Sequence, residues 1–473
     1  MVTSAKLYQA STPFQKFIRF AVFNLVRFFY PHLEIRGRDN LPADGPVMFV
    51  LNHPNGLMDP ILLMIGVERS VSFLAMSLLF ANPIGKTLCA AFGALPVFRR
   101  KDDGKPGGPR GDAAERNEVT FARCRQLLHQ GGALALFPEG ITHSEPQLAE
   151  LRTGAARIAL STEAEANWQA NLKIVPVGLW YEDKTTFRTS VLLVIGEPFT
   201  LSRWAEDYTL DEYETVRAVT AQIEEGLDAV VLQAENTELL SAVPILAEWT
   251  APHGDPATLT EQHTWAANLL ATYAYLHKND PTRLEQIADQ AWGYASVLQS
   301  LGVEDPWSLE LPDINHWWLL RATGQLLVGF PFALAGAALS YGPYRLARPA
   351  AMVLTGHDAT QISTFKLIGG ALFVLIGWII EAVLVGWWVD WGWGVLLFIA
   401  APFLGYVALR WSELWRAWRE VVSTWMVRWR RRHLVEALIA RRQSLTKAVQ
   451  AAVETWQLAG MPRVEGDRQL EKM

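Results

Sequence analysis

The chain has 473 residues, of which 50% are hydrophobic and 19% are charged, with 20 tryptophans and a formal net charge of −6. This mild charge does not suggest a nucleic-acid partner, whereas the excess of tryptophan and apolar residues indicates contact with a membrane. The two cysteines, Cys89 and Cys124, lack the spacing of metal ligands, so disulfide scaffolding and a zinc site are both unsupported. The length suggests two or three structural units, and we expect no signal peptide.

The first segment, Pro13 to Tyr30, combines many aromatic side chains with three cations on roughly one helical face, Lys16, Arg19 and Arg27. Such a helix can lie in the membrane interface with its cations toward lipid phosphates, and the three charges argue against a full span. We therefore assign residues 1–31 to an interfacial membrane helix. The alternative is a helix that caps the core of the following domain, and one helix can do both.

Residues 32–204 alternate short apolar runs with helical patterns, which predicts an α/β domain with a mixed sheet flanked by helices. The predicted strands are Leu33–Arg36, Val47–Leu51, Ser72–Ala75, Ala94–Phe98, Ala133–Phe137, Ile174–Trp180 and Val191–Ile195. The predicted helices are Pro60–Val67, Pro83–Phe92, Ala113–Gln130 and Gly154–Glu165. The Gly/Pro-rich, charged stretch from Lys101 to Asp112 is expected to be a mobile loop, either a lid or a plain linker.

A turn rich in Gly, Asn and Pro connects the second predicted strand to the first predicted helix, and it carries His53 and Asp59. An imidazole held by a carboxylate is the usual general base for removing a proton from a hydroxyl. A surface histidine followed by an N-cap aspartate would give the same pattern, because a two-residue motif is weak by itself. The pair therefore needs support from other parts of the chain.

Three further stretches supply that support. One strand ends with the adjacent guanidinium groups of Arg99 and Arg100, whose planar forks of donors suit phosphate oxygens. Another strand ends on a tight turn that carries Glu139, and a small-residue helix begins just after Arg152. Each stretch alone would be a decorated turn, but their order and spacing together indicate a site.

Four ordered blocks resemble the glycerolipid acyltransferase family typified by bacterial lysophosphatidate acyltransferases, over roughly Pro46 to Thr200. The blocks are Asn52-His53…Asp59, Gly93…Pro96-Val97…Arg99, Phe137-Pro138-Glu139-Gly140 and Val175-Pro176-Val177-Gly178. The resemblance implies a glycerol-3-phosphate acyltransferase-like fold in which His53 is the base and Asp59 orients it. It also implies that Glu139 and Gly140 shape the acceptor pocket and that an arginine of the second block holds phosphate. Arg152 stands where the family usually has a lysine, which keeps the charge and changes the geometry.

The spacing between His53 and Asp59 departs from most of that family, since five residues intervene instead of four. This longer spacing looks like that of the fungal-type glycerol-3-phosphate/dihydroxyacetone-phosphate acyltransferases. The match extends to Phe137-Pro138-Glu139-Gly140-Ile141-Thr142-His143-Ser144 and to Gly178-Leu179-Trp180-Tyr181 followed by Phe187-Arg188. We expect Gly56 to absorb the extra residue in a bulged turn, which Asn52 and Asn55 support.

The sequence thus predicts an O-acyltransferase that moves a fatty acyl group from acyl-CoA or acyl-ACP to glycerol-3-phosphate or dihydroxyacetone phosphate in phospholipid biosynthesis. We expect neither a metal nor a cofactor, and no acyl-enzyme, because no Ser or Cys nucleophile accompanies the histidine. The expected partners are membrane lipids, the thioester donor, the phosphorylated acceptor and, with an acyl-ACP donor, the carrier protein. Two alternatives stay open: a 1-acylglycerol-3-phosphate acyltransferase, whose acceptor also offers a hydroxyl near a phosphate, and a non-catalytic membrane lipid-binding scaffold.

The remaining chain is predicted to be helical. Residues 205–316 form a helical appendage without a chemical constellation, with helices over Asp211–Ala234, Glu261–Leu276 and Thr282–Leu301. Residues 317–409 carry the membrane segments, of which 367–389 and 391–409 form a hairpin. Residues 410–473 form a basic helix and tail, in which a stripe of indoles fits either an anionic membrane surface or a partner helix.

Basic residues flank both outer ends of the predicted hairpin, which places these ends in the cytoplasm. A single crossing by Ala322–Tyr344 would then put the catalytic unit outside the cell, away from cytosolic acyl donors. Pro331, with Gly329 and Gly336 nearby, suggests a break, so we expect residues 322–344 to form a re-entrant pair or two short segments that start and end on the cytoplasmic side. The protein is predicted to be a multi-pass protein of the cytoplasmic membrane, with its catalytic domain facing the cytoplasm. Glu381 is costly in lipid and should face another segment or water.

Overall fold

The computed structural model describes residues 12–459 except 82, 100–112, 253–257, 304–305, 311–315 and 356–358. The predicted loop of residues 101–112 therefore lies outside the described residues. The chain divides into two units, one comprising Met1–Leu240 with Ala359–Thr364 and the other Ser241–Asp358 with Phe365–Met473.

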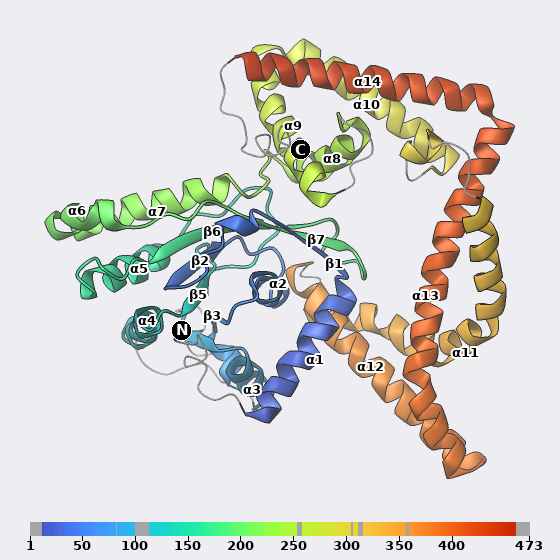
Figure 1. Ribbon diagram of the computed structural model, residues 1–473, viewed down its shortest axis with the longest axis horizontal. Coiled ribbons are helices and arrows are strands. Elements are labelled where there is room, and N and C mark those ends of the chain that lie inside the picture. Colours follow the sequence, from blue (N-terminus) through green and yellow to red (C-terminus); the bar gives the residue numbers. More distant parts are fainter. Residues whose placement is uncertain are drawn as a thin grey trace. The chain divides into compact units, whose positions relative to one another are not determined.

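The first unit is built on a seven-stranded sheet of order β1-β7-β6-β2-β5-β3-β4 (Figure 1). Only β6 and β7 pair in antiparallel fashion among these strands, and every other neighbouring pair is parallel. The strands are β1 (His32–Arg36), β2 (Val47–Leu51), β3 (Val71–Met76), β4 (Ala94–Val97), β5 (Ala133–Leu136), β6 (Lys173–Tyr181) and β7 (Ser190–Ile195). The predicted α/β fold with a mixed sheet is confirmed, and each predicted strand end lies within one residue of the observed end.

The central strand β2 is buried along its whole length. Its continuous run of apolar residues is typical of a strand that is covered on both faces of a parallel sheet. Helices from both sides of the sheet supply that cover (Figure 1). The helices of this unit are α1 (Pro13–Phe29), α2 (Met58–Val67), α3 (Pro83–Ala91), α4 (Ala113–His129), α5 (Gly154–Glu165), α6 (Ala205–Leu210) and α7 (Glu212–Asp228).

Helices α6 and α7 belong to the sheet unit, so the predicted boundary at residue 205 was wrong. Helix α7 packs against β6 and α5. Its buried apolar residues recur at helical spacing along one face, and they are Val216, Val219, Ile223 and Leu227. Polar residues on the other face of this helix made it look like part of a separate appendage in the sequence.

Helix α1 both covers the first unit and keeps an aromatic face exposed. Val26 and Phe29 are buried, and the helix packs against α2 and α3. Phe14, Phe17 and Phe20 are 62%, 65% and 67% exposed. These exposed rings fit the predicted contact with a membrane interface.

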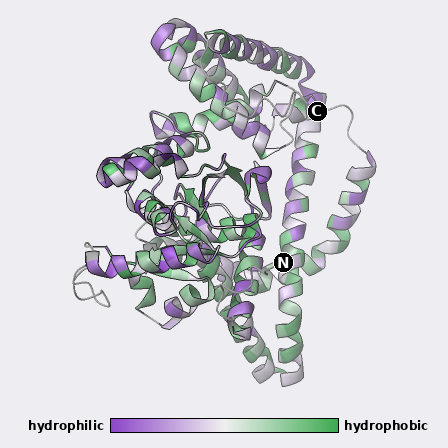
Figure 2. Cartoon of the chain, turned by 60° about the vertical axis from the view of Figure 1, so that its left-hand side comes forward, coloured by the Kyte–Doolittle hydropathy of each residue, from purple (hydrophilic) through white to green (hydrophobic). Residues whose placement is uncertain are grey.

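The second unit is helical, and three of its helices are long and apolar enough to cross a membrane: His316–Leu346, Thr364–Trp388 and Trp391–Arg430. The protein is therefore a membrane protein, and Figure 2 shows long hydrophobic stretches in its extended helices. The helices are α8 (Thr237–Thr250), α9 (Leu259–Asn279), α10 (Pro281–Leu301), α11 (His316–Thr355), α12 (Ala359–Trp388), α13 (Trp391–Arg430) and α14 (Arg432–Leu458).

The predicted break near Pro331 is not present, because α11 is a continuous helix through that residue. The glycine that suggested a break serves close packing instead. A Cβ atom on Gly336 would lie 2.0 Å from the carbonyl oxygen of Leu404 in α13, so only glycine permits this approach.

The tail is not the single long helix that was predicted. Helix α13 ends at Arg430, and α14 begins at Arg432. The first part of the indole stripe is a seam between helices, since Trp411 and Trp418 donate hydrogen bonds to Leu326 O (2.9 Å) and Thr323 Oγ1 (3.0 Å) of α11. The partner-helix interpretation therefore holds for this part of the stripe, while Trp425 and Trp429 remain exposed.

Candidate active site

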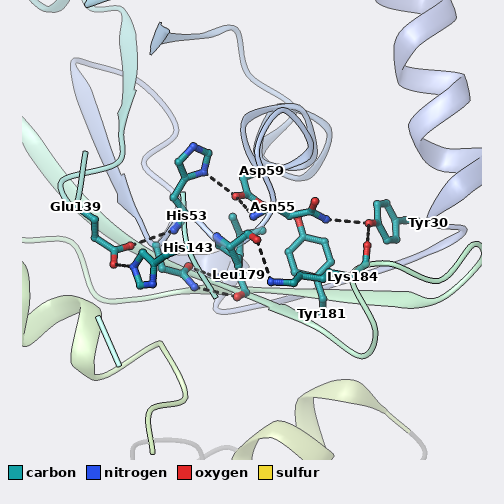
Figure 3. Close-up of polar contacts among 11 residues, drawn as sticks. Tyr30, His53, Asn55, Asp59, Glu139, His143, Leu179, Tyr181 and Lys184 are labelled. Atoms are coloured by element: carbon teal, nitrogen blue, oxygen red, sulfur yellow. Dashed lines mark hydrogen bonds and ion pairs between the residues drawn. The ribbon is translucent and has the colours of Figure 1, made fainter. Parts of the chain in front are cut away.

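The candidate site lies at the carboxyl ends of three neighbouring strands, β5, β2 and β6. His53 follows β2, Glu139 follows β5, and Tyr181 is the last residue of β6. Ligands of open α/β sheets usually bind outside the carboxyl ends of the strands. Residues that are far apart in the sequence thus meet at one edge (Figure 3).

His53 and Asp59 are in direct contact. The imidazole Nδ1 lies 2.8 Å from Asp59 Oδ2, and the carboxylate is fully buried while the imidazole is 17% exposed. Because Nδ1–H donates to the carboxylate, the neutral ring carries its lone pair on Nε2. Among the described residues, Nε2 has no hydrogen-bond partner, so it can accept a proton from a substrate. The ring also stacks on Phe137, with centroids 4.0 Å apart and an angle of 23° between planes.

The turn accommodates its fifth intervening residue without separating the pair. Gly56 adopts a φ of 42°, in the left-handed region that favours glycine. The backbone N–H of Asn55 donates to Asp59 Oδ2 at 2.8 Å. Asn52 extends the pairing of β2 and β6, because its side-chain amide exchanges two hydrogen bonds with the backbone of Leu179, at 3.1 and 2.8 Å. Asn52, Asn55 and Gly56 thus make contacts or adopt backbone conformations that fit their predicted supporting part, which stays a prediction.

Glu139 is buried and supports the same turn from the β5 side. One oxygen accepts from the backbone N–H of His53 at 3.2 Å. The other accepts from the backbone N–H of Ala149 at 2.8 Å and from His143 Nε2. The backbone N–H of Glu145 donates to His143 Nδ1 at 3.2 Å, which fixes the tautomer whose Nε2–H faces Glu139. Glu139 thus anchors the turn, and its predicted part in shaping an acceptor pocket stays a prediction.

The comparisons with known proteins concern the part of the chain that carries this site. Residues 32–180 match the model of the acyltransferase family. The chain carries an acyltransferase domain. An uncharacterised acyltransferase of Schizosaccharomyces pombe is 23% identical over 426 residues, which cover 73% of this chain and 63% of that protein. Glycerol-3-phosphate O-acyltransferase 2 of Saccharomyces cerevisiae is 28% identical over 196 residues, which cover 41% of this chain and 26% of that protein.

A chloroplastic 1-acyl-sn-glycerol-3-phosphate acyltransferase of Arabidopsis thaliana is 30% identical over 132 residues, which cover 28% of this chain and 33% of that protein. The chain therefore matches less than two thirds of the length of each of these relatives. One of these relatives is named for glycerol-3-phosphate as its acceptor, and another is named for the monoacylated form of glycerol-3-phosphate.

The predicted phosphate-binding arginines of the acyltransferase domain lie in different places. Arg152 is exposed, and its side chain lies 3.1 Å from the position that a Cβ atom on Gly140 would take. The backbone N–H of Arg152 donates to Pro138 O at 2.7 Å. Arg99 follows β4, and two strands lie between β4 and β2. Three strand spacings separate those backbones by about 14 Å. Arg100 lies outside the described residues, so Arg152 is the cation that the structure brings beside the 137–140 turn.

The site of the acyltransferase domain also contains four residues that we did not assign from the sequence. The Tyr181 hydroxyl donates to Asp59 Oδ1 at 2.5 Å. The Tyr30 hydroxyl accepts from Asn55 Nδ2 at 2.9 Å and donates to the Lys184 carbonyl at 2.7 Å. His143 contacts Glu139, and the Lys184 ammonium reaches Ser144 Oγ. Tyr181 and His143 lie in the stretches that resemble the family, but no role could be assigned to them from the sequence, because nothing in it pairs them with their partners on other elements.

Proposed function

We propose that this protein transfers a fatty acyl group from a thioester, acyl-CoA or acyl-ACP, to a hydroxyl of glycerol-3-phosphate or dihydroxyacetone phosphate in phospholipid biosynthesis. The observation that carries the proposal is the 2.8 Å contact of His53 Nδ1 with the buried Asp59, which leaves Nε2 as the proton acceptor. The similarity to a yeast glycerol-3-phosphate O-acyltransferase supports the acceptor class.

The chemistry balances with the chain's own residues. His53 Nε2 takes the proton of the acceptor hydroxyl as its oxygen attacks the thioester carbonyl, which forms a C–O bond and a tetrahedral oxyanion. The oxyanion collapses, the C–S bond breaks, and the imidazolium returns the proton to the departing thiolate. Asp59 holds the ring in the required tautomer and stabilises the imidazolium between these two steps.

Arg152 is proposed to hold the acceptor phosphate, and its replacement tests that role. Arg152→Ala should raise KM for glycerol-3-phosphate about 10-fold or more, the value of a hydrogen bond to a charged group, with little change in kcat. Arg157→Ala is the matched control, because Arg157 is an exposed arginine of the adjacent helix α5. Steady-state kinetics with each substrate varied in turn would check this. Equal KM values for both variants would contradict the role, and a rise confined to the thioester's KM would assign Arg152 to the donor.

An acceptor panel tests the function itself. Membranes that contain the protein, with matched membranes that lack it, are given acyl-CoA or acyl-ACP and either glycerol-3-phosphate, dihydroxyacetone phosphate or 1-acylglycerol-3-phosphate. We expect the highest kcat/KM with one of the two unacylated acceptors. A preference for the acylated acceptor would favour the second candidate, which the similarity to the Arabidopsis protein supports. If no ester forms with any acceptor, the non-catalytic lipid-binding scaffold is the alternative that remains.

We infer that the acyltransferase domain faces the cytoplasm, together with both ends of the membrane region. Helix α14 packs against α9 and α10. Arg283 of α10 donates to Thr455 Oγ1 at 3.1 Å, and the buried Arg442 pairs with Glu310 at 2.5 Å while lying 3.5 Å from the centre of the Trp307 ring. Helices α9 and α10 precede α11, and α14 follows α13. Because α14 packs against α9 and α10, the three helices lie on the same side of the membrane, so the chain between them crosses the membrane an even number of times. The hairpin of α12 and α13 supplies two crossings. A single crossing by α11 would make the total three, which is odd, so α11 does not cross the membrane.

The course of α11 supports this count. The helix runs antiparallel to α13 from Thr323, which contacts Trp418, to Gly336, which lies against Leu404. Pro343 then lies against Gly377, in the middle of α12. The helix from Ala359 to Gly377 is about 27 Å long, and the connection from Thr355 to Ala359 spans at most about 15 Å. The last part of α11 must therefore run back toward the start of α12, and Figure 1 shows the bend.

Cysteine labelling tests the orientation. Val389→Cys places a thiol at the exposed hairpin turn and His433→Cys places one on exposed α14. The native thiols should stay silent near pH 7, because burial raises the pKa of Cys89 and raises that of Cys124 to about 12. A membrane-impermeant maleimide should label Val389→Cys in intact cells and His433→Cys only in inverted vesicles. Labelling of His433→Cys from outside the cell would contradict the inferred orientation.

A further inference from the structure

We propose that Tyr181 is a positioning residue for acyl transfer, because its hydroxyl holds Asp59 in the orientation that directs His53 toward the acceptor hydroxyl. This inference rests on the proposed function and adds a third member to the pair of His53 and Asp59. The order of the contacts is phenol, carboxylate, imidazole, and the three residues come from β6, α2 and the turn after β2 (Figure 3).

The first argument is the hydrogen bonding of the Asp59 carboxylate. Oδ2 accepts from His53 Nδ1 and from the Asn55 backbone N–H, each at 2.8 Å. Oδ1 accepts from the Tyr181 hydroxyl at 2.5 Å, and the side chain of Asp59 is fully buried. Without that hydroxyl, one oxygen of a buried carboxylate would lose its donor, which is costly. The carboxylate would then gain by rotating, and this rotation would weaken its bond to His53.

The second argument is that Tyr181 is itself fixed. It ends the long strand β6 and pairs with Val191 of β7, and its ring lies 5.6 Å from that of Tyr30. Residues on regular elements hold a site more accurately than residues on loops. The phenol therefore gives Asp59 a reference point in the sheet, while His53 and Asp59 themselves belong to a turn and the first turn of a helix.

The third argument is that the phenol remains a donor. Burial, followed by the nearby Asp59 charge, raises the pKa of Tyr181 well above its ordinary value. The hydroxyl consequently keeps its proton throughout the range in which an imidazole base works. A neutral phenol can donate to a carboxylate without competing with His53 for the proton that is transferred.

Tyr181→Phe tests the proposal, because it removes the hydroxyl and keeps the ring. We expect kcat to fall about 10- to 100-fold. This is the change in rate that corresponds to the free energy of one hydrogen bond to a charged group. KM for the acceptor and for the thioester should stay within about twofold, because Tyr181 acts through Asp59 and not on a substrate. The matched control is Tyr30→Phe, which removes a neighbouring buried hydroxyl whose partners are Asn55 and Lys184. Its kcat should fall by clearly less.

The double variant Tyr181→Phe/Asp59→Ala distinguishes positioning from a merely structural role. If the phenol acts through the carboxylate, the double variant should be no slower than Asp59→Ala alone within about threefold. All variants are purified as single size-exclusion peaks and compared at equal folded protein, with thermal unfolding measured alongside. A wild-type kcat in Tyr181→Phe, an equal loss in Tyr30→Phe, or a full additional loss in the double variant would overturn the proposal. Failure of the unaltered protein with every acceptor would instead overturn the proposed function.

Discussion

Replacement of His53 by alanine is expected to slow acyl transfer by about 10²- to 10⁴-fold, which is the usual contribution of a positioned general base. A glycerol hydroxyl is a poor nucleophile near neutral pH, and Nε2 of His53 is the atom placed to take its proton. The fold should persist, because Asp59 keeps the backbone N–H of Asn55 and the hydroxyl of Tyr181 as donors. The lost imidazole is partly exposed and stacks on Phe137.

The measurement is ester formation from labelled acyl-CoA and glycerol-3-phosphate by equal amounts of folded protein. His129→Ala is the matched control, because His129 also contacts a carboxylate, that of Glu165 at 3.0 Å, but lies at the end of α4. It should retain activity within about twofold of the unaltered protein, as expected for a surface substitution away from special features. Full activity of His53→Ala with every acceptor would show that the proposed mechanism is wrong.

Asp59→Asn is expected to lower kcat by about 10²- to 10⁴-fold although the side chain keeps its shape, by analogy with the same change in serine proteases. Three donors converge on the two oxygens of Asp59: His53 Nδ1–H, the N–H of Asn55 and the hydroxyl of Tyr181. An amide offers one acceptor oxygen and an NH₂ group. If the NH₂ group faces Tyr181, the phenol must accept from it and its own proton loses its acceptor, and the neutral amide no longer stabilises the imidazolium. If the NH₂ group faces His53, two donors oppose each other, and the imidazole is driven toward the tautomer that carries its proton on Nε2.

The change should also lower stability, since an unsatisfied buried group costs about 1–3 kcal/mol. Kinetics and thermal unfolding of Asp59→Asn would be compared with those of Asp207→Asn, an exposed aspartate on α6 that serves as the control. KM for both substrates should be nearly unchanged, because Asp59 is buried behind His53. A kcat within twofold of the unaltered protein would remove Asp59 from the mechanism.

The strands could be predicted from the sequence because buried parallel strands read as short apolar runs between turn residues. Val47 to Leu51 is the clearest case, with every residue buried. The His53 and Asp59 pair could be proposed for a similar reason, since both residues lie on one short turn. Tyr181 could not, because its contact with Asp59 spans 122 positions of the sequence and depends on the pairing of β2 with β6.

The membrane region shows where periodicity stops being informative. An indole stripe at three- and four-residue steps suits a lipid surface and a helix seam equally, and the contacts of Trp411 and Trp418 with α11 decide for the seam. Gly336 near Pro331 suggested a broken helix, whereas the same glycine is what lets two helices pack closely. Only the identity of the neighbouring helix distinguishes these alternatives, and local sequence does not contain it.

The central claim is direct transfer from a thioester to an acceptor hydroxyl with His53 as base. It is tested by measuring thiol release and ester formation together, with purified protein in lipid nanodiscs, acyl-CoA and the preferred acceptor. We expect one ester for each thiol released, no appreciable thiol release when the acceptor is omitted, and loss of both products in His53→Ala. Thiol release without ester, or equal ester formation by His53→Ala, would contradict the claim.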